Sequence, residues 1–455
     1  MEKFFNPRSV VVVGASNSPF NLGATICNIL QYLKFEGNLF AVNTRAEAVH
    51  GCPGYSSITE IGEPIELAII ITPSRVVPDF VRQCGEKGIK NIIIESAGFS
   101  EEGEEGSRLQ EEVHTYAREH GIRFLGPNCL GVLDTRSRFC CFFGIIPGKY
   151  DDAFSNVGTI SYVIQSGGVG ALIMDSFQTD VTDVNKMVSI GNKEDVDEAD
   201  LIDFFDRDPD TEVIGMYLES IKNGRKLLEA ARKSQKPIMI FKVGRTSEGA
   251  RAALSHTAGM ANNDVIFENA CRQAGIIRLK AISELYSLPK IFTSMPPLKG
   301  KRVAVFTNSG AFGGITADLL VDAGLSMARL NRETQEKLAK TGKLYNVANP
   351  VDLGPTIAKQ TFIDIFDILL SSEEVDGLLP VPNVWQQVVI DAIMELEKMC
   401  RHYGKPAAIY IPNAADRIIQ IRNANRISVF ESPEEAVRAL TVSYQHYRYS
   451  MKKGS

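Results

Sequence analysis

The sequence Gln165-Ser-Gly-Gly-Val-Gly-Ala-Leu-Ile-Met-Asp175 directly follows the apolar, β-branched run Thr159–Ile164. Such a run predicts a buried strand, and the glycine-rich turn after it leads into a helical pattern from Ala171. The same pattern returns without gaps as Asn308-Ser-Gly-Ala-Phe-Gly-Gly-Ile-Thr-Ala-Asp318, after a strand pattern that begins at Arg302. Internal repetition on this scale predicts two α/β domains of one fold.

The N-terminal region has a related pattern of apolar runs separated by helical segments. The runs are Ser9–Val13, Leu39–Val42, Leu67–Thr72, Asn91–Glu95 and Arg123–Leu125. Continuous apolar strands separated by helices predict a parallel sheet that is covered on both faces. With 455 residues the chain is long enough for about three domains. We expect them at residues 1–130, 150–292 and 300–455.

The first strand leads into the turn Gly14–Gly23 and then a helix, an arrangement that brings backbone N–H groups close to a phosphate. The second strand is followed by Asn43-Thr44-Arg45, without the acidic residue that holds the ribose of a nicotinamide cofactor. The positive charge of Arg45 is better suited to a nucleotide with additional phosphates than to a nicotinamide cofactor. The alternative is a plain strand-to-helix turn that binds nothing.

Composition excludes several classes of protein. A charged fraction of 23% beside 44% hydrophobic residues is typical of a globular chain, and the net charge of −6 without a Lys/Arg cluster argues against nucleic acid as a partner. No apolar run reaches the roughly 18 residues of a membrane span, and Met1–Ser9 lacks the apolar core of a signal peptide. The eight cysteines have no metal-ligand spacing. We therefore expect a cytoplasmic protein without a bound metal.

The two repeats differ in one loop. After Lys236-Pro237 the first copy continues into the small-residue segment Gly244–Gly259, which contains His256. After Lys405-Pro406 the second copy has only a short segment without a histidine. A histidine on a loop with almost no bulky side chains is presented for reaction rather than for packing, although a solvated surface histidine is the common alternative.

A second difference is Glu219, which ends a strand where the second copy has Val381. The carboxyl ends of parallel strands face one crevice, so Glu219, Ser166 and the loop of His256 should converge. Glu219 could then orient the imidazole through one nitrogen, and the turn at Ser166 and Gly167 could offer N–H groups to an anion. Together these groups suggest phosphoryl transfer through a phosphohistidine. The alternative for Glu219 is a strand-end salt bridge.

These residues resemble a known family, the nucleoside-diphosphate-forming acyl-CoA synthetases, which are relatives of succinyl-CoA synthetase. The resemblance covers nearly the whole chain and is specific through the order and spacing of its motifs. They are Gly14-Ala-Ser16, Gly126-Pro-Asn-Cys-Leu-Gly131, Gln165-Ser-Gly167, Ser189-Ile-Gly-Asn192, Asp195-Val-Asp-Glu-Ala-Asp200, Tyr217-Leu-Glu219, Ser255-His-Thr257 and Asn349-Pro-Val-Asp352.

The resemblance implies an α/β chain with a Rossmann-like CoA-binding domain followed by two flavodoxin-like, succinyl-CoA-ligase-type domains. His256 would be the phosphorylated histidine with Glu219 as its partner, and Ser166 and Gly167 would hold the phosphoryl group. The residues that would contact CoA are Gly14, Ser16, Arg45, Pro73, Asn128 and Cys129.

The implied reaction is reversible and has three steps. Phosphate attacks an acyl-CoA to give acyl phosphate and CoA, the phosphoryl group moves to the histidine, and ADP takes it. The chain has no ATP-grasp module, so the resemblance implies an α-type subunit in a hetero-oligomer. An ATP-grasp β-type partner would then bring the Mg-ADP/ATP site.

Two departures and two alternatives accompany this resemblance. Family members usually have Gly-Ala-Leu-Ala-Gly after Ser-His-Thr, whereas here Ala258 precedes Gly259 and the glycine is shifted. The apolar segment Phe139–Ile146 either accommodates an acyl group larger than acetate or is a buried linker strand. The expected acid is acetate or another short-chain, branched or aryl acid. A catalytically silent CoA-binding regulatory module is the first alternative function, and a nicotinamide-dependent oxidoreductase is the second.

Overall fold

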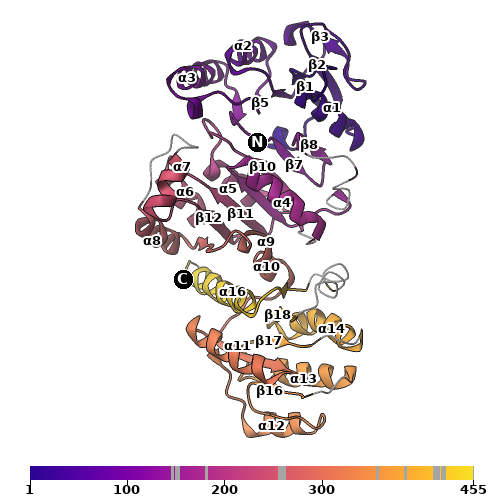
Figure 1. The fold of residues 1–455 in the computed structure, drawn as a ribbon, viewed down its shortest axis with the longest axis vertical. Coiled ribbons are helices and arrows are strands. Elements are labelled where there is room, and N and C mark those ends of the chain that lie inside the picture. Colours follow the sequence, from indigo (N-terminus) through magenta and orange to yellow (C-terminus); the bar gives the residue numbers. More distant parts are fainter. Residues whose placement is uncertain are drawn as a thin grey trace. The chain divides into compact units, whose positions relative to one another are not determined.

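A computed structural model of the protein describes residues 1–144, 148, 154–179, 183–254, 263–354, 358–383, 387–412, 421 and 427–453. The chain forms two compact units. The first comprises Met1–Gln178 and Thr182–Leu279, and the second contains Lys280–Ser455. The first unit holds two sheets and the second unit repeats the topology of one of them (Figure 1).

The first sheet has six parallel strands in the order β3-β2-β1-β4-β5-β6. This is the strand order of the Rossmann fold. The strands are β1 (Ser9–Val13), β2 (Asn38–Val42), β3 (Gly54–Tyr55), β4 (Leu67–Ile70), β5 (Asn91–Ile94) and β6 (Arg123–Leu125), and the connecting helices are α1 (Leu22–Tyr32), α2 (Val77–Lys87) and α3 (Glu104–Glu119). The five strands expected from the apolar runs are all present.

Both faces of this sheet are buried. Alternate side chains of β1 point to opposite faces of the sheet and pack into different cores. Val11 and Val13 belong to a core that includes Val81 of α2 and Val113 of α3, whereas Val10 and Val12 belong to a different core together with α1. Figure 1 shows α2 and α3 covering one face and α1 lying against the other. This double burial explains why the strands are apolar without alternation.

The second sheet has seven strands in the order β13-β12-β11-β9-β10-β7-β8. Five of them are parallel, and their order corresponds to the flavodoxin-like 2-1-3-4-5 arrangement. These strands are β9 (Ile160–Ile164), β10 (Val184–Ser189), β11 (Val213–Leu218), β12 (Ile238–Lys242) and β13 (Ile277–Arg278). The helices are α4 (Gly167–Thr179), α5 (Glu198–Arg207), α6 (Gly224–Lys233), α7 (Ser247–Leu254) and α8 (Asp264–Ala274).

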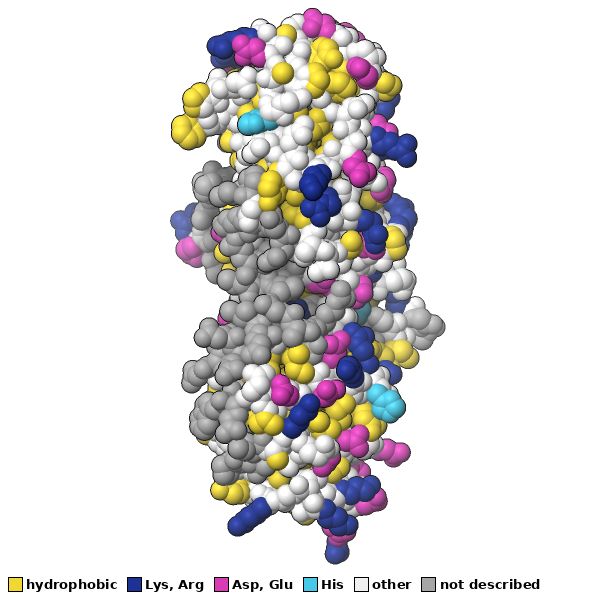
Figure 2. Space-filling model, turned by 90° about the vertical axis from the view of Figure 1, so that its right-hand side faces the viewer, with side chains coloured by type: hydrophobic (Ala, Val, Ile, Leu, Met, Phe, Trp, Pro, Cys, Tyr) yellow, Lys and Arg dark blue, Asp and Glu magenta, His cyan; other side chains and the backbone are white. Residues whose placement is uncertain are grey.

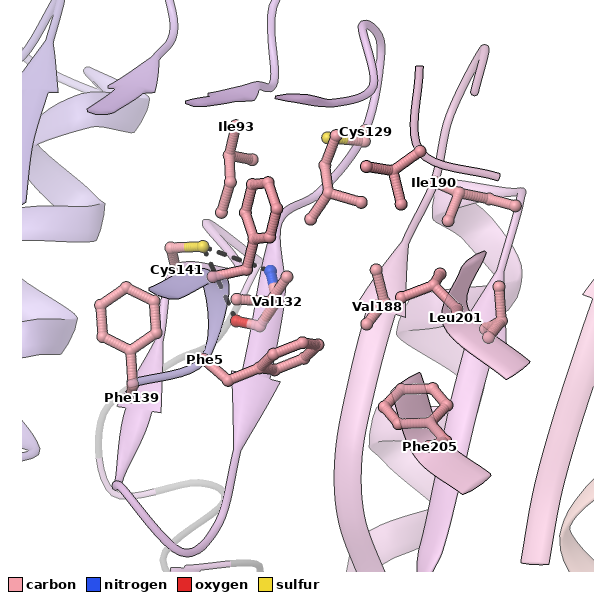
Figure 3. Close-up of a cluster of buried hydrophobic side chains, with 14 of the residues drawn as sticks. Phe5, Ile93, Cys129, Val132, Phe139, Cys141, Val188, Ile190, Leu201 and Phe205 are labelled. Atoms are coloured by element: carbon pink, nitrogen blue, oxygen red, sulfur yellow. Dashed lines mark hydrogen bonds between the residues drawn. The ribbon is translucent and has the colours of Figure 1, made fainter. Parts of the chain in front are cut away.

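The remaining two strands, β7 (Val132–Asp134) and β8 (Phe139–Cys140), add to this sheet in antiparallel orientation. Of the apolar segment Phe139–Ile146, Phe139 and Cys140 form the buried strand β8, Phe143 lies outside this strand, and residues 145 and 146 lie outside the described residues, so both alternatives for the segment stay open. The core of β7 and β8 is shared with the first sheet: Figure 3 shows Ile93 of β5 in the same cluster as Val132 and Val188. One hydrophobic core therefore holds the two sheets of the first unit together.

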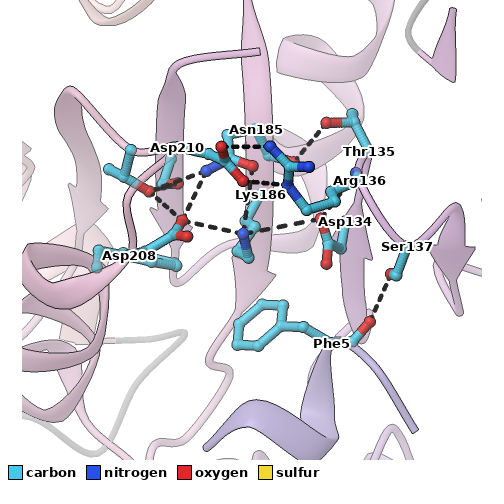
Figure 4. A network of polar contacts seen from close by, with 12 residues as sticks. Phe5, Asp134, Thr135, Arg136, Ser137, Asn185, Lys186, Asp208 and Asp210 are labelled. Atoms are coloured by element: carbon cyan, nitrogen blue, oxygen red, sulfur yellow. Dashed lines mark hydrogen bonds and ion pairs between the residues drawn. The ribbon is translucent and has the colours of Figure 1, made fainter. Parts of the chain in front are cut away.

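A buried polar network links β7 to the rest of the second sheet. Lys186 of β10 is 5% exposed and lies 2.9 Å from Asp208 and 3.8 Å from Asp134 of β7 (Figure 4). Asn185 donates to Asp208 at 2.7 Å, and Arg136 forms an ion pair with Asp210. A buried lysine is tolerated here because carboxylates and amide groups compensate its charge.

In the second unit, β14 (Arg302–Thr307) pairs in parallel with β15 (Ser326–Met327), β16 (Val351–Asp352) and β17 (Gly377–Val381). A parallel β-bridge between Leu378 of β17 and Ala407 extends the strand order toward β18 (Ile409–Tyr410), which pairs with β19 (Val429–Phe430). The helices are α9 (Glu284–Ser287), α10 (Lys290–Ser294), α11 (Gly310–Asp322), α12 (Arg332–Ala339), α13 (Lys359–Ser371), α14 (Gln387–Tyr403) and α16 (Pro433–Lys453). The predicted repeat is confirmed, because β14 and β17 are neighbours in the same way as β9 and β11.

The surface shown in Figure 2 carries acidic and basic side chains interspersed with one another, and no basic stripe is visible among the residues coloured there. None of the helices within the described ranges combines the length and apolar character that crossing a membrane requires. All eight cysteines are free thiols with buried side chains.

Candidate active site

A cavity of about 600 Å³ lies in the first unit where the carboxyl ends of both sheets meet. Ligands bind open parallel sheets at the point where the strand order reverses, which is between β1 and β4 in the first sheet and between β9 and β11 in the second. The loops that follow β4, β5, β6, β9, β10 and β11 all line the cavity. Their lining residues include Thr72, Pro73, Glu95, Ser96, Asn128, Cys129, Gln165, Ser166, Gly167, Asn192 and Glu219.

Most of the predicted site residues meet in this cavity. Pro73, Asn128, Cys129, Ser166, Gly167 and Glu219 all line it. Gly14, Ser16 and Arg45 are not among its lining residues and lie at the carboxyl ends of β1 and β2. His256 lies outside the described residues, as does the shifted Gly259.

The turn after β1 is built for close backbone approach. Gly14 has a φ of +97°, and a Cβ there would lie 2.2 Å from the carbonyl oxygen of Ile71. Asn21 caps α1 by accepting from the N–H groups of Ala24 at 2.8 Å and Ser16 at 3.0 Å, and it donates to the Gly14 carbonyl at 3.0 Å. The turn thus places the N-terminus of α1 at the carboxyl end of β1, a position that favours the binding of an anion.

Arg45 follows β2 and remains in solvent. Its side chain is 75% exposed and lies 3.8 Å from Glu47, and Asn43 accepts from its backbone N–H at 3.2 Å. A surface ion pair of this kind contributes little stability, so the guanidinium is available to a phosphate.

Glu219 is positioned through its backbone. The side-chain oxygen of Gln165 accepts from the Glu219 N–H at 2.8 Å and from the Ser220 N–H at 3.1 Å. The Gln165 amide also donates to the Ser220 hydroxyl at 3.1 Å, and Lys193 donates to the Ser220 carbonyl at 2.5 Å. The half-buried carboxylate of Glu219 forms a hydrogen bond with Tyr217, whose pKa is raised to about 12 by burial and by that carboxylate.

Ser166 and Gly167 lie at the N-terminus of α4 and line the same cavity as Glu219. The first turn of a helix has N–H groups without partners inside the helix, and they attract an anion. A Cβ at Gly167 would lie 3.4 Å from the nearest atom, in the side chain of Leu130, which also lines the cavity. The turn can therefore hold a phosphoryl group in the cavity that Glu219 lines.

The loop after β6 forms the wall of the cavity that belongs to the first sheet. Asn128 adopts a φ of +58° and donates its N–H to the Ser96 carbonyl at 2.9 Å. The Cys129 thiol donates to the Ile94 carbonyl at 3.4 Å, and burial raises the pKa of this thiol well above its ordinary value. Cys129 is therefore a neutral wall residue and not a nucleophile.

Gln165 and Glu95 are among the cavity residues that were not predicted as site residues. Gln165 was considered only as part of a repeated motif, although it positions Glu219. Glu95 ends the strand pattern Asn91–Glu95, and an acidic residue at the carboxyl end of a buried strand is the signal that could have identified it. It is 95% buried and lines the cavity.

Comparison with known proteins gives a consistent assignment. The family description "CoA binding domain" matches residues 8–135, and "Succinyl-CoA ligase like flavodoxin domain" matches residues 157–292. The chain is 33% identical to the acetate–CoA ligase [ADP-forming] II subunit alpha of Pyrococcus furiosus, over 96% of each chain. The chain belongs to the ADP-forming acid–CoA ligase family.

Other members of this ligase family include longer chains. An acetate–CoA ligase [ADP-forming] II of Archaeoglobus fulgidus is 35% identical over 97% of this chain, which spans 66% of that relative. Among solved structures, the dinucleotide-forming acetyl-coenzyme A synthetase 1 of Ca. Korarchaeum cryptofilum, in complex with phosphate and ADP, matches with a TM-score of 0.90. It is 29% identical and the match covers 100% of this chain and 99% of that chain. The predicted fold and family are thus confirmed.

Proposed function

We propose that this chain is the α-type subunit of an ADP-forming acyl-CoA synthetase. The enzyme interconverts acyl-CoA, ADP and phosphate with acid, ATP and CoA through an acyl phosphate and a phosphohistidine at His256. The observation that carries the proposal is the cavity itself. It is lined by the N-terminus of α4 and by Glu219 from one sheet and by the loops after β4, β5 and β6 from the other, which supports an anion site beside a CoA site.

In the proposed first step, phosphate is held by the N–H groups around Ser166 and Gly167. A phosphate oxygen attacks the thioester carbonyl carbon, a C–O bond forms, and the C–S bond breaks. The helix dipole of α4 stabilises the added negative charge. CoA approaches from the turn at Gly14 and from Arg45, past Pro73, and its thiol end lies along Asn128 and Cys129.

In the second step, a nitrogen of His256 attacks the phosphorus of the acyl phosphate and the carboxylate of the acid leaves. Glu219 accepts a hydrogen bond from the other ring nitrogen, which fixes the tautomer and stabilises the phosphorylated imidazole. The Gln165 clamp holds Glu219 in place for this contact. In the third step ADP removes the phosphoryl group.

The nucleotide site is assigned to an ATP-grasp β-type partner. Within the described ranges of this chain, no three His, Cys, Asp or Glu side chains are grouped to hold a metal ion. Two relatives are named as alpha subunits, which supports a separate partner. We propose that magnesium and ADP or ATP bind to that partner, and that the cytoplasmic enzyme is a hetero-oligomer.

The acid is proposed to be acetate or another short-chain, branched or aryl acid. Related proteins are named for acetate, for 4-hydroxybutyrate and for trans-ferulate. Phe143 contributes an apolar side chain to the cavity, in keeping with an acyl group larger than acetate. The volume of about 600 Å³ leaves room for the end of the pantetheine arm together with such a group.

The test is a screen of acids for CoA-dependent ADP release by the chain with its co-purified partner. His256→Asn is expected to abolish turnover, whereas the matched control His402→Asn, on the exposed face of α14, is expected to retain it. Intact CoA binding without acyl transfer for any acid would instead support a silent regulatory module. A thermal shift with NAD and none with CoA would favour an oxidoreductase.

A further inference from the structure

Lys193 is a buried lysine that the steps above do not use. It lies in the loop after β10 (residues 190–197), and its side chain is 1% exposed. Its ammonium group lies 2.8 Å from the carboxylate of Glu198, whose side chain is also buried, and donates to the Ser220 carbonyl at 2.5 Å. Apolar residues of similar size often stabilise a fold as well as a buried ion pair does. The position of this pair beside the candidate active site therefore requires an explanation other than folding alone.

The contact with Ser220 connects Lys193 to Glu219, the preceding residue of the chain. The buried side chain of Gln165 accepts from the N–H groups of Glu219 at 2.8 Å and Ser220 at 3.1 Å. Lys193 binds the carbonyl that follows these two N–H groups. Two buried side chains thus fix the backbone donors and the backbone acceptor directly after β11, where the side chain of Glu219 lines the cavity.

The loop that carries Lys193 is itself held by the loop after β6. A Cβ at Gly191 would lie 2.3 Å from the carbonyl oxygens of both Pro127 and Asn128, so the two backbones are in direct contact. The Asn192 N–H donates to the Pro127 carbonyl at 2.9 Å. Lys193 has a φ of +46°, a conformation that is uncommon for a residue with a side chain. Lys193 therefore reaches Ser220 from a loop whose own position is well determined.

The second copy of the fold has no lysine at the position of Lys193. Ser189 pairs with the last residue of β9, and Asp352 pairs in the same way with the last residue of β14. Counting four residues onward from each of them places Thr356 at the position of Lys193. The second copy also lacks an acidic residue at the position of Glu219. The shared fold therefore does not require Lys193, which occurs only in the copy that has the glutamate.

We propose that Lys193 is a positioning residue for phosphoryl transfer to the histidine. With Glu198 as its counter-ion, Lys193 holds the Ser220 carbonyl and thereby keeps the carboxylate of Glu219 where it orients the imidazole. This inference rests on the proposed function. Lys193 is not among the residues that line the cavity, so it acts through Glu219 and not on a substrate. Its role is confined to the second step, because the first step does not use Glu219.

The test measures the two steps separately in the full-length chain, alone and with its partner subunit. Labelling of His256 by an acyl phosphate, in the absence of CoA, measures the step that uses Glu219. Arsenolysis of an acyl-CoA measures C–S cleavage, because acyl arsenates hydrolyse spontaneously and the released thiol can be titrated. Acetyl, 4-hydroxybutyryl and feruloyl derivatives are compared first, and the acyl group that reacts fastest is used.

Two variants remove the contact with the Ser220 carbonyl. Lys193→Met leaves the carboxylate of Glu198 buried without its cation. Lys193→Met combined with Glu198→Leu removes both charges, and this variant is expected to fold because apolar residues are often tolerated in place of a buried ion pair. Misplacement of a catalytic group by about 1 Å can cost roughly 100-fold, so we expect labelling of His256 to slow about 10-fold or more in both variants. Arsenolysis is expected to keep its wild-type rate.

Lys186→Met is the matched control. Lys186 is another buried lysine of the second sheet, but its ammonium group faces Asp208 and Asp134, and it is not among the residues that line the cavity. This variant loses a buried cation without any change near Glu219. We expect the folded variant to label His256 and to cleave acyl-CoA at the wild-type rates.

A double-mutant comparison shows whether Lys193 acts through Glu219. When Lys193→Met is added to Glu219→Gln, the slow residual labelling should not fall further, because residues that act together are not additive. A further loss as large as in the wild-type background, wild-type labelling in the variant without both charges, or equal losses in labelling and arsenolysis would each overturn the positioning role. Absence of any label on wild-type His256 would instead reject the proposed function.

Discussion

The side-chain oxygen of Gln165 accepts hydrogen bonds from two consecutive backbone N–H groups, those of Glu219 at 2.8 Å and Ser220 at 3.1 Å. Gln165 immediately precedes the anion-binding turn at Ser166. One side chain therefore connects the proposed phosphate site with the proposed orienting carboxylate. The second copy has a corresponding contact, because Asn308 accepts from the Asn383 N–H at 2.8 Å. The strand pairings match Val381 with Tyr217, so the counterpart of Glu219 is Asn383 and not, as expected from the sequence, Val381; the second copy has no acidic residue there.

Gln165→Ala should release Glu219 from this clamp. Misplacement of a catalytic group by about 1 Å can cost roughly 100-fold in rate, so we expect turnover to fall by about 10-fold to 100-fold with little change in CoA affinity. Asn308→Ala removes the corresponding contact from the copy without a glutamate and is expected to retain turnover. Steady-state kinetics of both variants provide the comparison. Equal losses in the two variants would show that the clamp has only a structural role.

Arg45→Ala tests the assignment of the exposed guanidinium to a CoA phosphate. Loss of a hydrogen bond to a charged group is worth about 1.5–3 kcal/mol, so CoA affinity is expected to weaken roughly tenfold or more. Dephospho-CoA, which lacks the ribose phosphate, is the matched ligand and should bind wild type and variant equally. Calorimetric titration of both ligands measures the difference. An equal loss for both ligands would contradict contact with the ribose phosphate and place Arg45 elsewhere along CoA.

Lys186→Met tests the buried network that fastens β7. It leaves Asp134 and Asp208 without their cation, and breaking a buried ion pair in this way costs about 3–5 kcal/mol of unfolding free energy. The control Lys3→Met removes a surface ion pair with Glu66 and should cost at most about 1 kcal/mol. Urea denaturation of the two variants gives both values. Similar urea midpoints for both variants would contradict the conclusion that Lys186 stabilises the fold through its buried ion pairs.

The same network predicts a dependence of stability on pH. Burial alone raises the pKa of Asp208, but hydrogen bonds from Thr211 and Lys186 outweigh burial and leave the pKa below its ordinary value of 3.8. Because the folded state lowers this pKa, Asp208 contributes its full stabilisation above pH 3.8, and the contribution disappears as the pH falls through the lower, folded-state pKa. Asp208→Asn should reduce the acid sensitivity of unfolding in that range, whereas an unchanged acid midpoint would contradict this assignment.

The sequence predicted the parts of the fold that depend on buried parallel strands. The repeat of Gln165–Asp175 at Asn308–Asp318 identified two similar domains, because a strand, a tight turn and a helix constrain residue types at every position. The strands β7 and β8 were not predicted as members of the second sheet. They are two or three residues long and antiparallel, and their pairing depends on distant contacts with β10.

The candidate site was predictable where a residue differs between the copies. Glu219 was identified in this way and lines the cavity as expected. Glu95 has no repeated partner for comparison, and its burial without a hydrogen-bond partner is visible only in three dimensions. Gln165 looked like part of a shared motif, since its contact with the Glu219 backbone cannot be inferred from residue type. His256 lies outside the described residues, so its role stays a proposal.

The most direct test of the account is to map the phosphorylated residue after incubation with an acyl phosphate, or with labelled ATP and the partner subunit. We predict one acid-labile, base-stable phosphoryl group on the peptide that contains His256, strongly reduced in Glu219→Gln and absent in His256→Asn. No label under either condition, or stable label on another residue, would contradict phosphoryl transfer through His256.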